Sequence, residues 1–63
     1  MNNENRIAPR PYSITELARL YQVSNRVMKN WLRPLASAIG EKIGRYYTIR
    51  QVEIIFEELG EPE

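Results

Sequence analysis

The chain contains neither cysteine nor histidine among its 63 residues, and this absence constrains its fold more than any other feature. Without cysteine, disulfides, iron–sulfur clusters and thiolate zinc sites are excluded. Without histidine, the chain also lacks the commonest metal ligand and general base. A chain of this length buries only about 60% of its unfolded surface, so a second domain is excluded as well. We therefore expect one small domain held together by its apolar core, with association between copies as the remaining source of stability.

The composition is that of a folded chain. Hydrophobic residues make up 43% of the sequence and include one Trp, four Tyr and one Phe, which is normal for a globular protein. The apolar runs are only a few residues long, so neither a transmembrane span nor a signal peptide is expected. The sequence therefore predicts a cytoplasmic protein with no membrane partner.

The formal net charge of +1 conceals a division along the chain. Residues 1–50 hold all nine Lys and Arg and three Glu, a net of +6, whereas residues 51–63 hold five Glu and no base. This asymmetry predicts a basic working surface, with the acidic segment facing elsewhere.

Two short helices are predicted in the first half of the chain. Ser13, with Glu16 three positions later, has the pattern of a capping box, and the helix that follows has room for two turns. Ser24 can cap a second helix that runs from Asn25 to residue 32 or 33, because Pro34 disfavours helical geometry before it. The first helix has one apolar face, formed by Ile14, Leu17, Ala18 and Tyr21.

The second predicted helix separates its residues into two faces at about 100° per residue. The apolar face is expected to consist of Met28, Trp31, Leu32 and, if the helical turn persists that far, Leu35. The opposite face holds three cations and an amide with no acid, namely Arg26, Lys29, Asn30 and Arg33.

A small hairpin and a third helix are predicted in the second half. Gly40 and Gly44 bracket a short turn before Tyr46 and Tyr47, and turn glycines beside aromatic residues favour a hairpin. The two tyrosines alternate across a strand, so one should be buried and the other exposed. A second capping box, Thr48 with Gln51, opens the third helix, whose apolar stripe is Ile49, Val52, Ile55, Phe56 and Leu59.

The ends of the predicted domain follow from its prolines and glycines. Residues 1–11 are polar and close with two prolines, so they are expected to form a flexible tail. Gly60 and Pro62 stop the third helix, which leaves residues 12–60 as the domain and residues 61–63 as a C-terminal tail. Arg6 and Arg10 could instead form an arm that follows the DNA minor groove.

Residues 12–20 (YSITELARL), Val23-Ser24, Arg26 and Met28 together resemble the helix-turn-helix of MerR-type regulators and of phage and transposon excisionases. Residues 44–48 (GRYYT), followed by Gln51-Val52, are similar to the wing of these proteins and the start of their next helix. The resemblance covers residues 12–59 and implies a mostly α, winged helix-turn-helix fold that binds double-stranded DNA. MerR regulators continue into a long dimerisation helix and an effector domain, so an excisionase-like or minimal module is expected here.

The turn between the first two helices departs from this family. Such units usually place glycine four positions after the small residue Ala18, where φ is positive, and this chain has Gln22 there. A residue other than glycine is uncommon in that conformation. The turn should therefore be slightly strained or differently shaped.

The predicted core consists of Leu17, Ala18, Val23, Met28, Trp31, Ile49, Val52 and Phe56. The predicted DNA-binding residues are Ser24, Asn25, Arg26, Lys29, Asn30, Arg33, Lys42 and Arg45. In this hypothesis arginine pairs with guanine, asparagine pairs with adenine, and the remaining cations neutralise phosphates. Free amides at the start of the second helix could also hold a phosphate near Ser24.

No enzyme, cofactor, metal or small-molecule ligand is expected, because the chain lacks Asp, His, Cys and a phosphate-binding glycine loop. The competing hypothesis is a protein-interaction module that uses the third helix and its acidic face. Ile54 lies opposite the predicted apolar stripe and is a candidate contact between copies on DNA. The DNA target, the number of copies, and the choice between a role in recombination and one in transcription stay open.

Overall fold

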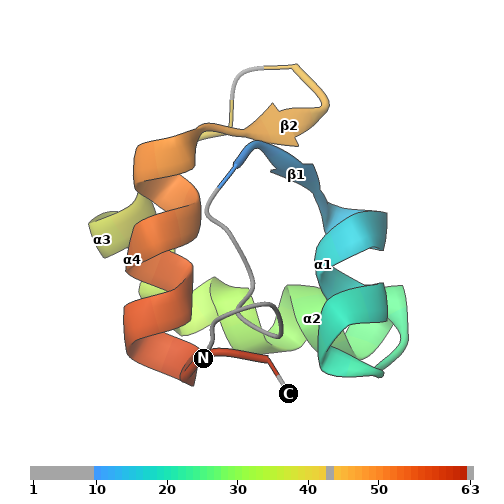
Figure 1. The fold of residues 1–63 in the computed structure, drawn as a ribbon. Helices are drawn as coiled ribbons and strands as arrows, with labels where there is room; N and C mark the ends of the chain where they lie inside the picture. Colours follow the sequence, from blue (N-terminus) through green and yellow to red (C-terminus); the bar gives the residue numbers. More distant parts are fainter. Residues whose placement is uncertain (1–9, 43, 63) are drawn as a thin grey trace, which may run out of the picture.

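The computed structural model describes residues 10–42 and 44–62, and this part of the chain is mostly helical (Figure 1), as predicted. A two-stranded sheet lies at one end, α4 and α1 extend from it on opposite sides of the view, and α2 crosses the opposite end (Figure 1). No helix in the described residues has the length and apolar character needed to cross a bilayer. The elements in chain order are β1 (Tyr12–Ser13), α1 (Ile14–Tyr21), α2 (Asn25–Leu32), a 3-10 turn (Arg33–Leu35), α3 (Ala36–Ile39), β2 (Tyr46–Tyr47) and α4 (Ile49–Leu59).

Side-chain caps set the starts of the three longer helices, as the sequence predicted. The Ser13 hydroxyl accepts from the Glu16 amide at 3.2 Å, and the Glu16 carboxylate accepts in return from the Ser13 amide at 3.0 Å. The Ser24 hydroxyl accepts from the amide of Val27 at 3.2 Å. A second reciprocal pair, between Thr48 and Gln51, begins α4. These bonds satisfy amides that a helix leaves without intrahelical partners.

The turn between α1 and α2 has the conformation that favours glycine, although glutamine occupies it. Gln22 lies at φ 60° and ψ 44°, and its backbone N–H donates to the carbonyls of Ala18 and Arg19. The Val23 amide also reaches the Ala18 carbonyl, at 2.9 Å. The turn therefore keeps the left-handed backbone of a helix-to-helix turn and places a Cβ where steric strain disfavours one.

The sheet differs from the expected hairpin in the origin of one strand. β2 pairs antiparallel with β1, with Tyr12 opposite Tyr47 and Ser13 opposite Tyr46. The prediction of a local hairpin between Gly40 and Thr48 was therefore wrong in its pairing, and Ile43 within it lies outside the described residues. A two-residue strand is too short to be stable alone. Pairing with β1 is favoured because it buries Tyr12 against Phe56, with ring centroids 6.3 Å apart.

A 3-10 turn and α3 connect α2 to the segment before β2, where the sequence predicted only a short apolar stretch. Pro34 lies in the first turn of the 3-10 segment, where a missing amide proton costs no hydrogen bond. α3 then buries Ile39. Pro34 therefore ends α2, as predicted, without ending helical structure.

The core lies between the helices and beneath the sheet. Leu17, Met28, Val52 and Ile55 are the largest of its fully buried side chains. Partly buried residues packed against this core include Val23 and Ile54. The core as a whole comprises Tyr12, Leu17, Ala18, Met28, Leu32, Ile39, Val52, Ile55 and Phe56.

Four predictions about burial were wrong or incomplete. Trp31 is 41% exposed, because Met28 and Leu32 occupy the centre of the apolar face of α2 and leave Trp31 at its edge. Ile49 is 49% exposed, because it is the first residue of α4, at the end of the helix. Val23 is only partly buried, since it follows the turn at the rim of the core. Ile54 was predicted to lie on the side of its helix away from the core, but it is packed against the core.

Candidate nucleic-acid interface

The polar face of α2 is exposed along the whole helix. Its four predicted residues, Arg26, Lys29, Asn30 and Arg33, are all exposed, with Arg33 capping the helix C-terminus. Met28 and Leu32 are buried on the other side. Because the buried side fixes the rotation of α2, this face, termed here the α2 cationic face, must point to solvent.

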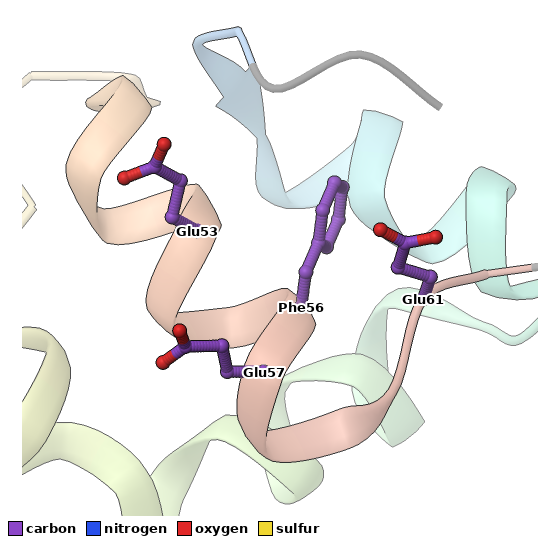
Figure 2. Close-up of a pocket in the computed structure, with 4 residues that line it drawn as sticks. All are labelled: Glu53, Phe56, Glu57 and Glu61. Carbon is purple, nitrogen blue, oxygen red and sulfur yellow. The ribbon is translucent and has the colours of Figure 1, made fainter. Parts of the chain in front are cut away.

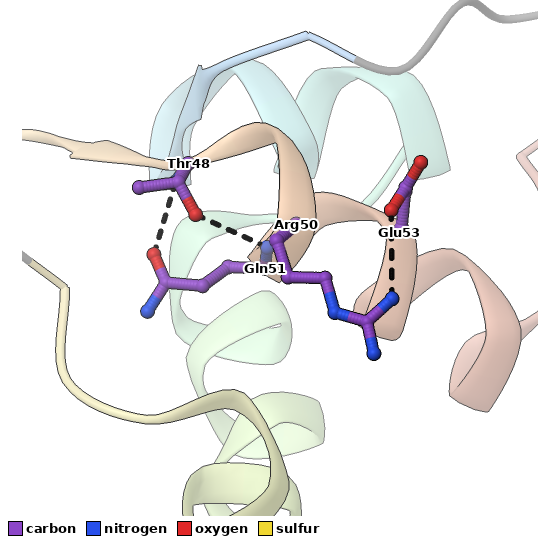
Figure 3. A network of polar contacts seen from close by, with 4 residues as sticks. All are labelled: Thr48, Arg50, Gln51 and Glu53. Atoms are coloured by element: carbon purple, nitrogen blue, oxygen red, sulfur yellow. Dashed lines mark hydrogen bonds and ion pairs between the residues drawn. The ribbon is translucent and has the colours of Figure 1, made fainter.

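The cations of this face lack acidic partners in the described part of the chain. The one ion pair among residues 10–42 and 44–62 joins Arg50 Nη1 and Glu53 Oε1 at 3.7 Å, and it lies on α4 (Figure 3). The positive charges on α2 are thus not neutralised within those residues. An external anion can therefore pair with them without displacing an internal carboxylate.

Ser24 and Asn25 are exposed at the start of α2, and both already make internal hydrogen bonds. The Ser24 hydroxyl caps α2, and the Asn25 side-chain amide donates to the Thr15 hydroxyl of α1 at 3.0 Å. These bonds hold the first turn of α2 against α1. Both residues can therefore orient the α2 cationic face, besides any contact of their own.

The two predicted cations near β2 differ in their surroundings. Lys42 is partly buried, and its ammonium lies 5.2 Å from the centroid of the Tyr47 ring, within range of a cation–π interaction. Burial raises the pKa of the Tyr47 hydroxyl above its ordinary value, so the ring stays neutral. Arg45 is exposed, and so is Tyr46 beside it. Tyr46 is therefore the exposed tyrosine, as one of the two was predicted to be, whereas Tyr47 is only partly buried. Arg45 is the more exposed of the two cations.

β2 and α2 lie at opposite ends of the view in Figure 1. Arg10 also lies at the sheet end, with its guanidinium carbon 4.2 Å from the Tyr12 ring centroid. Arg6, the other cation of the expected tail, lies outside the described residues.

An apolar hollow that the sequence did not predict lies at the sheet end. Tyr46 and Ile49 are each 49% exposed there, and Arg50 stands beside them with most of its side chain in solvent. The signal was present in the sequence, because Ile49 directly follows the cap Thr48 and the first residue of a helix often lies beyond the core. The hollow is lined by Pro11, Tyr46, Tyr47, Thr48, Ile49 and Arg50.

α4 and the residues directly after it carry the acidic side chains of the last part of the chain. Glu53, Glu57 and Glu61 surround a hollow whose floor includes Phe56 (Figure 2). Carboxylates in this arrangement repel phosphate.

Trp31 lines two further hollows, one of which includes Gln22 of the turn between α1 and α2. Its ring meets Tyr21 edge-on, with centroids 6.1 Å apart at 88°. One hollow includes Asn30, Pro34 and Leu59 with Trp31. This exposed indole is the largest apolar group next to the α2 cationic face.

Comparison with protein-family models, with curated proteins and with solved structures finds no match for this chain.

Proposed function

We propose that this protein binds double-stranded DNA with sequence preference by laying α2 in the major groove. The observation that carries the proposal is the α2 cationic face, which presents three cations and one amide without an acidic partner in the described residues. An α-helix fits the width of the major groove, and this mixture of side chains serves both readout and phosphate contact.

The side chains of that face divide by chemistry into two roles. Arg26 can donate two hydrogen bonds to guanine, and Asn30 can pair with adenine. Lys29 and Arg33 neutralise phosphates and supply affinity without sequence preference. Arg45 adds a backbone or minor-groove contact from the sheet end.

The finer assignment is a winged helix-turn-helix, with α1 and α2 as the helix-turn-helix and the segment leading into β2 as the wing. The left-handed turn at Gln22 and the Ser24 cap support the first part. Among the members of that class, we favour a cytoplasmic excisionase-like recombination factor or a small transcriptional regulator. Both act by positioning on DNA and need no catalytic group.

Binding measured against salt tests the proposal directly. A duplex selected from a random library should bind more weakly as salt rises, because each neutralised phosphate releases counterions. Replacing Arg26, Lys29 and Arg33 together by alanine should abolish the preference for the selected duplex. Arg50→Ala serves as a control, because its charge is already paired with Glu53. Unchanged binding of cognate and random duplexes by the triple variant would overturn the proposal.

A protein-interaction module is the second candidate, and the exposure of Trp31 favours it. Aromatic side chains are enriched where proteins meet. Such a contact would depend strongly on Trp31 and weakly on salt. The same titration with Trp31→Ala therefore distinguishes the two functions.

We also propose that several copies act together on DNA. One small module covers only about 600–1,000 Å² of protein surface, which limits affinity and the length of sequence read. Ile54 is a poor probe of a contact between copies, since it packs against the core. Band-shift stoichiometry on one site and on two adjacent sites tests the proposal instead, and equal affinity per site would refute cooperative assembly.

A further inference from the structure

Gln51 joins two parts of the chain that are separate in sequence. Its side-chain carbonyl accepts from the Thr48 amide at 2.9 Å, which completes the capping box of α4. Its side-chain NH2 donates to the carbonyl of Ile39 at 3.1 Å and to that of Glu41 at 3.0 Å. Figure 3 shows the side chain of Gln51 running back past the start of α4 toward Thr48.

The helix cap alone does not require glutamine at this position. Glutamate completes a capping box equally well, and its charge would also suit the positive end of the helix dipole. A carboxylate cannot donate, however, whereas the amide offers one acceptor and two donors. The two carbonyls at the end of α3 therefore account for an amide in place of a carboxylate.

Lys42 and Arg45, two of the cations of the sheet end, follow directly after the residues held by Gln51. Glu41 is bonded to Gln51, and Tyr46, directly after Arg45, is paired with Ser13 in the sheet. Lys42 packs over Tyr47 at 5.2 Å. Arg45 thus directly precedes a residue held in the sheet, although its own side chain is exposed.

We propose that Gln51 is a positioning residue, which anchors residues 39–41 to α4 and so presents Arg45 for contact with DNA. The contact with DNA rests on the proposed function, whereas the anchor rests on the hydrogen bonds alone. Anchoring raises affinity because the loop does not have to be ordered when DNA binds.

The test uses Gln51→Glu, which keeps the cap acceptor but turns both donors into acceptors that face the carbonyls of Ile39 and Glu41. The matched control is Thr48→Asp. It adds the same negative charge next to Gln51, and aspartate is a good helix cap, so both anchoring donors remain. Thermal melting establishes that each variant is folded.

Amide hydrogen exchange by NMR reads the anchor without DNA. Gln51→Glu should accelerate exchange of the Gly40 amide, which donates to the Ala36 carbonyl at 2.8 Å, by about tenfold or more, because the end of α3 opens locally. Exchange within α4 should stay within about twofold of wild type in both variants. A wild-type exchange rate for the Gly40 amide in Gln51→Glu would overturn the anchor.

A double-mutant cycle with Arg45→Ala reads the link to DNA. In wild type and in Thr48→Asp, Arg45→Ala should make the slope of log affinity against log salt less steep by about one. In Gln51→Glu, the same Arg45→Ala change should reduce the steepness of that slope by less than half as much, because Arg45 is no longer held in place. Equal effects of Arg45→Ala in all three backgrounds would overturn the positioning role.

The two proposals fail in different ways. If wild type binds no duplex while Gln51→Glu still accelerates exchange of the Gly40 amide, the proposed function is refuted, and with it the DNA role of Gln51, but the anchor is supported. If wild type binds duplex and the cycle is additive, the proposed function stands and only the positioning role is refuted.

Discussion

The hydroxyl of Tyr21 donates a hydrogen bond of 2.6 Å to the carbonyl of Gly60, which lies 39 residues further along the chain. This bond ties the end of α1 to the residue that follows α4. The Tyr21 ring also contacts Trp31 and Phe56 edge-on, with centroid distances of 6.1 and 6.4 Å. Tyr21 thus links α1, α2 and α4 at the end of the molecule opposite the sheet.

Tyr21 should make the protein sensitive to alkali. Burial, with a smaller contribution from Glu61, raises the pKa of Tyr21 from 10.0 to about 12. The unfolded chain therefore loses this proton first as pH rises, so the stability that Tyr21 contributes is complete below about pH 10 and disappears between about pH 10 and 12. Tyr21→Phe should cost about 0.5–1.5 kcal/mol at pH 7.

Urea unfolding at pH 7, 9 and 11 checks this prediction. The stability difference between wild type and Tyr21→Phe should be the same at pH 7 and 9 and smaller at pH 11. Comparing the two proteins at each pH cancels the titration of lysines. A difference that grows with pH would contradict the assignment.

Met28 and Trp31 should differ sharply when each is replaced by alanine. Met28 is fully buried, so Met28→Ala should cost about 2–5 kcal/mol. Trp31 is 41% exposed and retains mainly its contact with Tyr21, so Trp31→Ala should cost about 1–2 kcal/mol. Chemical denaturation followed by circular dichroism measures both. A larger loss for Trp31→Ala would show that the indole is more buried in solution than the structure has it.

Gln22→Gly should stabilise the protein by up to about 1 kcal/mol. Glycine adopts φ 60° without the steric cost that glutamine incurs, although it also gives the unfolded chain more freedom. Asn30→Gly, an exposed position inside α2, should instead destabilise by about 0.5–1 kcal/mol. Melting temperatures of both variants provide the measurement, and destabilisation by Gln22→Gly would argue against the left-handed turn.

Ser24→Asp should separate stability from DNA binding. Aspartate caps a helix as well as serine does, so the melting temperature should change little. Its charge would repel a phosphate placed at the start of α2, and affinity for any duplex should fall by about tenfold. Ser13→Asp makes the same change at the cap of α1 and provides the control. Equal losses from the two variants would contradict a phosphate near Ser24.

The sequence by itself determined where the longer helices begin and how α2 divides its polar and apolar residues. Ser13, Ser24 and Thr48 each cap a helix through a bond to the amide three residues later, and such a bond depends only on the local chain. The buried positions Met28 and Leu32 likewise follow from helical spacing. The residues of the α2 cationic face were predictable for the same reason, although their function stays a prediction.

Only the tertiary structure decided which apolar side chains the core accepts and which strand β2 joins. Trp31 and Ile49 fit a helical stripe as well as their buried neighbours do, yet the facing elements do not reach them. The pairing of β2 with β1 and the bonds from Gln51 to Ile39 and Glu41 join segments far apart in sequence. Helix caps are local hydrogen bonds, so the residues three positions apart predict them. Burial and long-range pairing depend on how separate elements pack against one another, and the spacing of residues along one segment does not determine that packing.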